Sequence, residues 1–318
     1  MSKIRNRPVG GESRPSLYQE VTDRIIAELE QGRVPWVQPW GHAKAGLGLP
    51  NNALSGRSYS GVNILILWGA VIENGYASQQ WLTFRQALEL GGNVRKGEHG
   101  TMVCYADRFI PKAEIERAAR DGDEPGAVPF LKRFTVFNIA QCEGMPERLQ
   151  YEPKPMPERE VIPQAEALIT ATGADFRIGG DRAFYTPGGD YIQVPPQPAF
   201  FDQINYYRTC YHELAHWSGA AHRLARDLKG GFGSKSYARE ELVAEMASAF
   251  ICATLGIVPT VRHADYLGSW LEVLRENNRA IFRAASQASK AADFILAFRQ
   301  SATESQMAAI AEGTEVAA

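Results

Sequence analysis

The sequence is poor in cysteine, carries little net charge and has no long hydrophobic run. Its four cysteines lie far apart and form no CxxC pair, a pattern typical of a reduced protein with buried thiols rather than of a disulfide framework. A formal net charge of −2 requires neither a nucleic-acid partner nor a membrane partner. No apolar stretch approaches the roughly 18 residues that span a bilayer, and residues 1–15 lack the apolar core of a signal peptide. We therefore expect a cytoplasmic protein with no membrane partner.

What the sequence does contain is an ordinary globular composition, with 45% hydrophobic and 22% charged residues over 318 positions. That length suits about two domains. A proline-rich segment marks the boundary between them, because its composition is typical of a semi-rigid spacer. The predicted organisation is a first domain at 1–150 with a flexible tail at 1–15, a linker at 151–164, a second domain at 165–300 and a frayed carboxy-terminal tail at 301–318.

The two predicted domains differ in their residue patterns. In the first, segments with helical spacing (SLYQEVTDRIIAELEQG and GVNILILWGAVIENG) are followed by two strand-like segments (TMVCYADRFIP and FLKRFTVFNIAQC) on either side of a charged loop. In the second, a helix and a hairpin at Gly188-Gly189 precede helical patterns that fill the remainder. We therefore predict an α+β protein, with a first domain that is α+β and a second that is mainly helical with a small sheet.

The clearest chemical signal is the segment YHELAHWSGAAHR, which places three of the six histidines within eleven residues. Residues four apart share a helix face, so His212 and His216 can point at one cation. Glu213 lies one position on, where its carboxylate can act as a general base, as in the H-E-x-x-H motif of zinc peptidases. The alternative is a surface helix with two solvated histidines. The long helical pattern ending at Gly219 and the strand-like YIQVPP before it favour the metal site.

Two residues compete to be the third metal ligand. His222 completes the longer H-E-x-x-H-x-x-G-x-x-H spacing of metzincins, although it can equally lie on the surface beyond the helix. Glu241 and Glu245 lie four apart on a later helical pattern, on a face of small residues where carboxylates are costly unless paired or metal-bound. We favour Glu241 as the ligand and Glu245 as the residue that orients a ligating histidine. We expect one zinc ion per chain, with manganese or another divalent ion as the alternative.

The amino-terminal half interleaves aromatic and basic residues. The candidates for contact with a nucleic acid are Trp36, Trp40, Arg57, Tyr59, Arg95, Lys96, Lys132 and Arg133. Rings that stack on bases and cations that follow phosphates are the features of single-strand binding. The other interpretation is that these rings belong to the core, since this half has only a small excess of basic residues, far from a basic footprint. The residues alone leave both interpretations open.

The order and spacing of several segments resemble the ArdC-type antirestriction proteins of conjugative plasmids, whose amino-terminal domain also occurs in TraC-type primases. These segments include SLYQEVTDRIIAELEQGRVPWVQPW, WLTFRQALELGGNVRKGEHGTMVCY, YHELAHWSGAAHRLAR and SYAREELVAEMASAFICATLGI, and all together they cover most of residues 16–297. The resemblance implies a domain that binds single-stranded DNA joined to a zincin-like metallopeptidase domain. It implies His212, His216 and Glu241 as metal ligands and Glu213 as the base.

The resemblance also implies a role in protecting incoming plasmid DNA from host restriction during conjugation. Two hypotheses of different class follow. In the first, the protein is an enzyme, a gluzincin-like metallopeptidase whose substrate is a protein of the recipient cell. In the second, it is a non-proteolytic single-stranded-DNA-binding or primase-accessory protein whose metal site is a structural clamp. The sequence indicates no particular oligomeric state.

Overall fold

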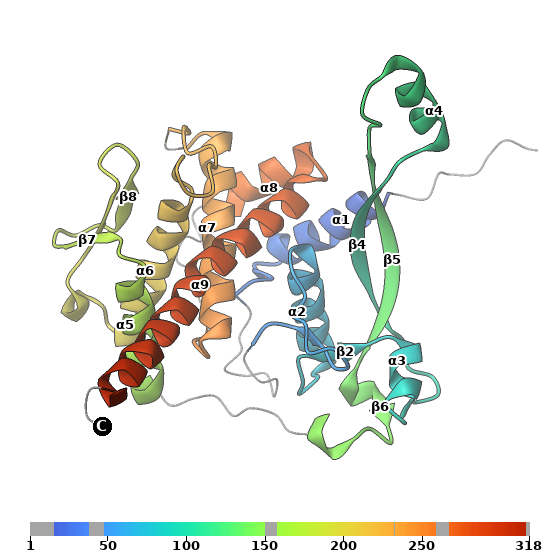
Figure 1. Ribbon diagram of the computed structural model, residues 1–318, viewed down its shortest axis with the longest axis horizontal. Coiled ribbons are helices and arrows are strands. Elements are labelled where there is room, and N and C mark those ends of the chain that lie inside the picture. The colour runs from blue at the N-terminus through green and yellow to red at the C-terminus, as the bar shows by residue number, and fades with distance from the viewer. Residues whose placement is uncertain (1–15, 38–47, 150–157, 232, 259–266, 316–318) are drawn as a thin grey trace, which may run out of the picture.

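The computed structural model describes residues 16–37, 48–149, 158–231, 233–258 and 267–315. It arranges them as a mixed α+β amino-terminal half and a mainly helical carboxy-terminal half that meet along a layer of helices (Figure 1). A long β-hairpin projects from the amino-terminal half, on the side away from the carboxy-terminal half. The predicted α+β class is confirmed.

The amino-terminal half builds a small sheet beside two helices. Its elements are α1 (Leu17–Glu30), β1 (Asn51–Asn52), α2 (Val62–Asn74), β2 (Gln80–Leu82), α3 (Phe84–Glu89), β3 (Asn93–Val94), β4 (Thr101–Phe109), α4 (Lys112–Asp121), β5 (Val128–Asn138) and β6 (Cys142–Glu143), with short 3-10 helices at Ile139–Gln141 and Glu147–Leu149. The four-stranded sheet has the order β1-β2-β5-β4, and β3 pairs with β6. Ser16 caps α1 by accepting a hydrogen bond from the Gln19 amide. The apolar α2 is buried along most of its length, because it packs against both β4 and the helices of the other half.

Strands β4 and β5 extend beyond the sheet as a two-stranded hairpin, which we call the arm (residues 101–138). Nine cross-strand pairs run from Thr101–Val136 to Phe109–Val128. The segment at the tip, expected from the sequence to be a loop, contains helix α4, which ends at Gly122 in the left-handed conformation. Figure 1 shows the arm standing away from the rest of the molecule with α4 at its end.

The carboxy-terminal half places a three-stranded sheet beside a bundle of helices. Its elements are α5 (Glu158–Ala171), β7 (Asp175–Ile178), β8 (Phe184–Thr186), β9 (Tyr191–Val194), a 3-10 helix at Gln197–Ala199, α6 (Gln203–Ser218), α7 (Lys235–Thr254), α8 (Leu267–Glu276) and α9 (Ala280–Glu315). The sheet order is β7-β9-β8, so β8 is an edge strand. Helix α7 is central, since α6, α8 and α9 all pack against it. Within the described part of the chain, no helix combines the length and the apolarity that a membrane crossing needs.

Two boundaries differ from those expected. Helix α5 begins at Glu158, inside the predicted linker, and contains Pro163. A proline there removes one helical hydrogen bond, but the helix is held by tertiary packing because Ala165 and Leu168 are buried in the core. Helix α9 continues to Glu315, through the predicted frayed tail. The segment SATESQMAAIAE contains neither glycine nor proline, the residues that end helices.

The two halves share one hydrophobic core. The same cluster of buried side chains contains Val21, Leu65 and Trp68 from the first half and Phe250 and Trp270 from the second. The ring centroids of Trp68 and Phe250 lie 5.7 Å apart in an edge-to-face contact.

Hydrogen bonds also cross between the halves. The Thr22 hydroxyl donates to the Asn278 carbonyl oxygen at 2.7 Å, and the Gly61 amide donates to the Ser289 hydroxyl at 2.9 Å. A chain cut between the halves would expose this apolar surface to water. Binding experiments on the amino-terminal half therefore require the full chain.

Candidate metal centre

Helices α6 and α7 bring the histidine motif and the later carboxylates face to face. Helix α6 is buried along almost all of its second half. Small residues of α7, including Ala244 and Ser248, permit close approach of the two helices. The Ser248 hydroxyl donates a hydrogen bond to the Arg208 carbonyl oxygen of α6 at 3.2 Å. This contact holds the helices in a register that places Glu241 opposite the two histidines.

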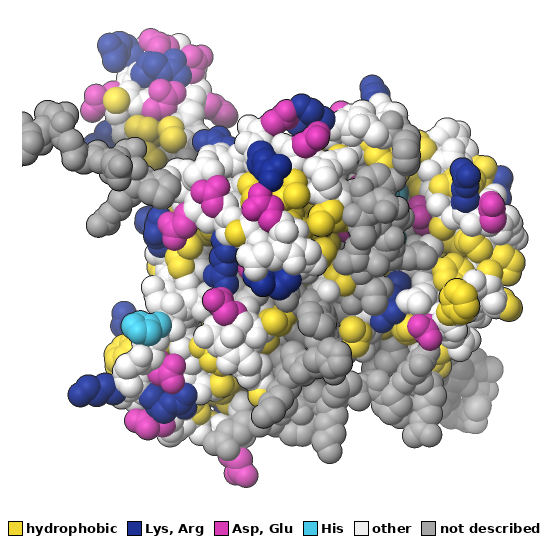
Figure 2. All heavy atoms as spheres, turned by 180° about the vertical axis from the view of Figure 1, so that it is seen from behind, with side chains coloured by type: hydrophobic (Ala, Val, Ile, Leu, Met, Phe, Trp, Pro, Cys, Tyr) yellow, Lys and Arg dark blue, Asp and Glu magenta, His cyan; other side chains and the backbone are white. Residues whose placement is uncertain are grey.

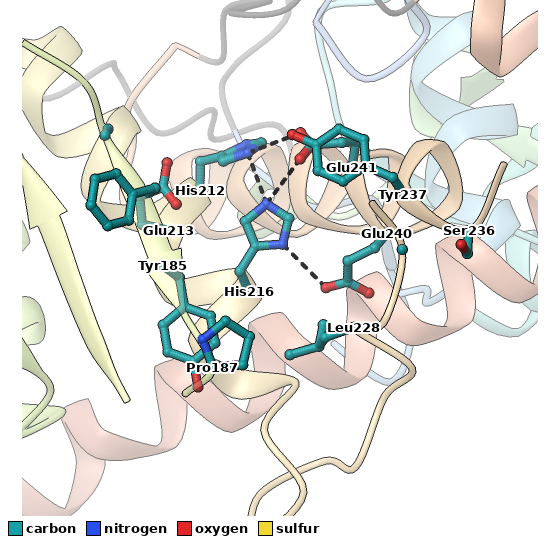
Figure 3. Close-up of a pocket in the computed structure, with 13 residues that line it drawn as sticks. Tyr185, Pro187, His212, Glu213, His216, Leu228, Ser236, Tyr237, Glu240 and Glu241 are labelled. Atoms are coloured by element: carbon teal, nitrogen blue, oxygen red, sulfur yellow. Dashed lines mark hydrogen bonds and ion pairs between the residues drawn. The ribbon is translucent and has the colours of Figure 1, made fainter. Parts of the chain in front are cut away.

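Three donor atoms converge between these helices. Nε2 of His212 lies 3.2 Å from Nε2 of His216. Glu241 reaches both rings, with carboxylate oxygens 3.4 Å from His212 Nε2 and 3.5 Å from His216 Nε2. One ligand atom from each of the three residues lies within 4.8 Å of the other two. Figure 3 shows the three side chains pointing toward a common point.

Each histidine has its own carboxylate on the far side of its ring. A carboxylate oxygen of Glu245 lies 3.6 Å from His212 Nδ1, and one of Glu240 lies 3.3 Å from His216 Nδ1. Carboxylates in this position orient a ligating imidazole and raise its basicity. Glu245 is the residue for which the sequence predicts such an orienting role. Glu240 was missed, because it is adjacent to Glu241 and helix periodicity assigns it to a different face.

An arginine holds Glu240 in place. Arg226 donates from Nη2 to Glu240 Oε1 at 2.7 Å and from Nε to Glu240 Oε2 at 3.1 Å. Its guanidinium also donates to the Ser218 hydroxyl at 2.9 Å and to the carbonyl oxygen of Ala215. The side chain of Arg226 is only 4% exposed, so these bonds are shielded from water. The carboxylate of Glu240 is therefore positioned from two sides.

The electrostatics of the centre follow from burial and close opposite charges. Burial disfavours the charged imidazole of His216, but Glu240 and Glu241 outweigh burial and raise the pKa of His216 to about 10. Burial likewise favours the neutral form of Glu241, yet both histidines hold the pKa of this carboxyl far below its usual range. The pKa of Glu240 is also lowered against the effect of burial, by His216 and Arg226. A cation therefore has to displace a proton to bind His216.

The donor set fits a divalent cation. Two imidazole nitrogens and one carboxylate oxygen are the ligands that zinc takes in catalytic sites, and manganese accepts the same atoms. When both histidines are in the neutral form that binds a cation, the carboxylates of Glu240, Glu241 and Glu245 outnumber the one charged basic group among these partners, Arg226. Such an excess of negative charge is favourable beside a bound cation.

Glu213 lines a pocket that opens beside the three donor atoms. The pocket has a volume of about 270 Å³, and its walls include Tyr185, His216 and Tyr237. Strand β8 forms one wall (Figure 3). Glu213 is 5% exposed, and Figure 3 shows it on the opposite side of the histidines from Glu241. Its carboxylate is thus close to the donor atoms without belonging to their cluster.

His222 lies apart from the donor atoms, with a side chain that is 65% exposed and 3.5 Å from Asp190. The chain turns after α6, and Arg223 donates from Nε to the Trp217 carbonyl oxygen at 2.8 Å. The guanidinium of Arg223 stacks 3.8 Å from the Trp217 ring centroid and pairs with Asp190. These contacts of Arg223 leave its neighbour His222 at the surface. The metzincin arrangement is therefore absent from the described structure.

The residues expected to contact DNA occupy several places in the amino-terminal half. Arg57 and Lys96 are exposed, in turns after β1 and β3, and Tyr59 is half-buried. Arg95 donates from Nη2 to the Ala140 carbonyl oxygen and to the Glu98 carboxylate, both at 2.7 Å. Its positive charge is therefore already paired with Glu98 within the protein. Lys132 and Arg133 lie on β5, in the arm. Trp40 lies outside the described residues.

The expectation that Trp36 stacks on bases is wrong for this fold. Its side chain is 0% exposed, and its ring packs edge-to-face against Trp270, with centroids 5.5 Å apart. Trp270 belongs to α8, so the ring of Trp36 is buried against the second half of the molecule. Trp36 therefore contributes to the core shared by the two halves.

Comparisons with known proteins agree with this division of the molecule. Residues 163–287 match a family model described as a zincin-like metallopeptidase. Residues 15–137 match the model of the N-terminal domain of anti-restriction factor ArdC. The chain thus carries a domain of the zincin-like metallopeptidase class behind an ArdC-type amino-terminal domain.

Whole-chain relatives narrow the class to a family. The uncharacterized protein y4eC of Sinorhizobium fredii is 42% identical over 299 residues, which is 92% of this chain and 95% of the relative. A DNA primase TraC of Escherichia coli is 37% identical over 315 residues, which is 93% of this chain but only 28% of the primase. The metal-free crystal structure of antirestriction protein ArdC from plasmid R388 has a TM-score of 0.74 and 41% identity, over 89% of this chain and 97% of that one. A Mn(II)-bound structure of the same protein has a TM-score of 0.74 and 40% identity, over 89% and 98% of the two chains. The protein belongs to the ArdC family of antirestriction proteins.

Proposed function

We propose that the protein is an antirestriction factor that binds single-stranded DNA with its amino-terminal half and hydrolyses peptide bonds at its metal centre. In this role it protects incoming plasmid DNA from host restriction during conjugation. The observation that carries the proposal is the gathering of His212, His216 and Glu241 beside Glu213 in one pocket of an ArdC-family chain. We propose one ion per chain, zinc or the manganese found in the Mn(II)-bound ArdC of plasmid R388.

The residues of the chain suit peptide hydrolysis. When bound, a divalent cation polarises a carbonyl oxygen and makes water more acidic. His212, His216 and Glu241 would hold that cation. Glu213 would take the proton of the attacking water on its carboxylate and pass it to the leaving amine, the two halves of general acid–base catalysis. Its low exposure favours this role, since bulk water is kept from the carboxylate.

The edge strand β8 supports a peptide as the substrate. Strand β8 pairs with β9 along one edge, and among the described strands none pairs with its other edge. Its residues Phe184 and Tyr185 line the pocket. An extended peptide can add to the outer edge of such a strand through main-chain hydrogen bonds. This pairing would lay the scissile bond along the pocket, beside Glu213.

The alternative function, a structural metal clamp, is less well supported. A structural site is closed by four protein ligands, whereas a catalytic site keeps an open position. Within the part of the chain that the structure describes, three ligand atoms gather, and a pocket opens beside them. This arrangement favours the enzyme.

The variant Glu213→Gln tests the proposal. It removes the base and leaves the three proposed ligands, so hydrolysis of a general protein substrate such as casein should fall at least about 100-fold. Metal content and affinity for single-stranded DNA should stay unchanged. If hydrolysis persists at the wild-type rate, Glu213 is not the base. If the metal-loaded wild type hydrolyses neither casein nor the proteins of a recipient-cell extract, the metal site is better explained as a structural clamp.

The same variant separates hydrolysis from protection in the cell. We expect Glu213→Gln to protect unmodified plasmid DNA during conjugation into a restricting recipient, because coating of single strands can delay their conversion to a restriction substrate. If transfer falls instead to the level of a strain that lacks the protein, with metal content and DNA affinity unchanged, proteolysis of a recipient protein carries the protection.

A further inference from the structure

One face of the arm collects aromatic side chains. In an antiparallel pair, residues directly opposite each other share a face, as do every second residue along each strand. Tyr105 is opposite Lys132, and Phe109 is opposite Val128. This register places four rings on one side of the arm, and we call them the aromatic face (Tyr105, Phe109, Phe130 and Phe134).

The rings contact each other, and three of the four are about half exposed to solvent. Tyr105 packs edge-to-face on Phe134 with centroids 5.8 Å apart, and Phe109 packs on Phe130 at 5.6 Å. Tyr105, Phe109 and Phe134 are nevertheless 49%, 50% and 45% exposed. Cross-strand pairing of the rings explains how they stiffen an isolated hairpin. It does not explain why so much ring surface faces water, and clustered exposed apolar surface marks an interaction site.

The aromatic face carries a basic side chain, Lys132, and an acidic side chain, Asp107. The Lys132 ammonium lies 4.9 Å from the centroid of the Phe130 ring, among the aromatic side chains. The acid on this face, Asp107, already accepts hydrogen bonds from the Tyr105 hydroxyl at 3.3 Å and from the Arg108 amide at 2.7 Å. A phosphate could therefore approach Lys132 beside the rings.

The wider surface gives little support to binding by charge alone. Arg133 lies on the opposite side of the arm and pairs with Glu20 at 2.6 Å. Figure 2 shows basic and acidic side chains intermingled over the face in view. Unstacked bases offer flat surfaces for such rings whatever the sequence, whereas paired bases in a duplex do not.

We propose that the aromatic face of the arm is the surface on which single-stranded DNA binds. Bases stack on Tyr105 and Phe134 near the body of the protein and on Phe109 and Phe130 farther out, while Lys132 contacts a phosphate. The proposal rests on the proposed function, because it assigns a place to the binding of single-stranded DNA. A protein partner on the same face is the competing occupant.

The test measures binding of a fluorescein-labelled oligo(dT) 30-mer to the full chain by fluorescence anisotropy. The double variant Tyr105→Ala/Phe134→Ala should weaken binding about tenfold or more, since stacking on one ring accounts for at least about a fivefold change in affinity. Phe201→Ala is the matched control, because Phe201 is a fully exposed ring of the other half. Tyr105→Phe keeps the ring, so it should bind like the wild type.

Salt dependence gives a second, independent readout. Lys132→Gln should lower the slope of log affinity against log salt concentration by about one, since one phosphate contact is lost. The Tyr105→Ala/Phe134→Ala variant should leave that slope unchanged, because the rings release no counterions. Should the alanine variant fold poorly, Tyr105→Leu/Phe134→Leu keeps apolar bulk without ring faces and should show a similar loss of affinity.

The outcomes distinguish this inference from the proposed function. If the wild-type chain does not bind the oligonucleotide, single-strand binding itself is wrong. If the wild type binds and both double variants bind equally well, DNA binds elsewhere and the assignment of the aromatic face is overturned. Loss of affinity in the double variants with retention in Phe201→Ala and Tyr105→Phe supports the assignment.

Discussion

The metal centre and the arm use their side chains in opposite ways. At the centre, the side chains of His212, His216 and Glu241 are 3%, 13% and 5% exposed, and further buried groups position the two rings. On the arm, aromatic rings pack on one another across the hairpin, and Tyr105, Phe109 and Phe134 keep about half of their surface in water. A single cation demands a fixed set of distances, which only a packed environment maintains. A flexible single strand of nucleic acid, by contrast, varies in sequence. Exposed rings suit such a ligand, because any base can stack on them.

The largest expected effect tests the centre. His216→Ala should abolish stoichiometric metal binding, and Glu241→Ala should weaken it strongly, because each removes one of three converging donors. His222→Ala is the control and should leave binding nearly intact, since that ring lies at the surface. Elemental analysis of the purified variants measures the outcome. The ligand assignment is wrong if His222→Ala loses the ion while Glu241→Ala retains it.

A second variant asks whether a ring of the amino-terminal half belongs to the core or to the DNA surface. Trp36→Ala should destabilise the full chain by about 3–5 kcal/mol, the usual cost of truncating a buried tryptophan, as measured by urea unfolding. Phe201→Ala should change stability by no more than about 0.5 kcal/mol, because it removes an exposed ring. If Trp36→Ala keeps wild-type stability but binds DNA more weakly, this ring belongs to the DNA-binding surface of the protein and not to its core.

A third variant tests whether the centre depends on groups behind its ligands. Glu240→Gln should lower metal affinity about 10–100-fold, the usual cost of removing a carboxylate that orients a ligating histidine. The matched control is Glu276→Gln, which alters an exposed carboxylate paired with Lys235 on the surface. Competition with a fluorescent chelator reports the affinities. Thermal unfolding of the metal-free proteins checks that the variant remains folded. An unchanged metal affinity in Glu240→Gln would show that Glu240 has no part in orienting His216.

The smallest expected effect concerns the base of the arm. Glu20→Gln breaks the ion pair between Glu20 and Arg133. The side chain of Glu20 is 42% exposed and that of Arg133 is 51% exposed. Exposed pairs of this kind contribute about 1 kcal/mol or less and are screened by salt. The loss in urea-unfolding free energy should therefore be small and should shrink as salt is added. A loss of several kcal/mol, independent of salt, would mean that this contact anchors the arm to α1.

Much of the architecture follows from patterns within single segments. Helix periodicity puts His212 and His216 on one face, and the same spacing relates Glu241 to Glu245, because neighbouring turns bring such residues together wherever the helix lies. The alternation of apolar and polar residues predicts that β4 and β5 are strands. The same alternation puts the aromatic rings on one face, since Tyr105 and Phe109, like Phe130 and Phe134, are four positions apart in the sequence, which is an even spacing. Spacing alone could have identified that face, although it could not show that the arm stands clear of the body.

Other features depend on which segments pack together, and no local pattern contains that information. Trp36 is buried because Trp270, more than two hundred residues later, covers it. Glu240 reaches His216 because Arg226 and the turn after α6 hold its carboxylate against that ring. The choice between His222 and Glu241 likewise rests on tertiary contacts, as the pairing of Arg223 with Asp190 keeps His222 at the surface while the packing of α7 on α6 brings Glu241 to the histidines. Hydrogen bonding and periodicity act over a few residues and can be inferred from the chain, whereas burial and pairing between distant residues are set by the packing of the whole molecule.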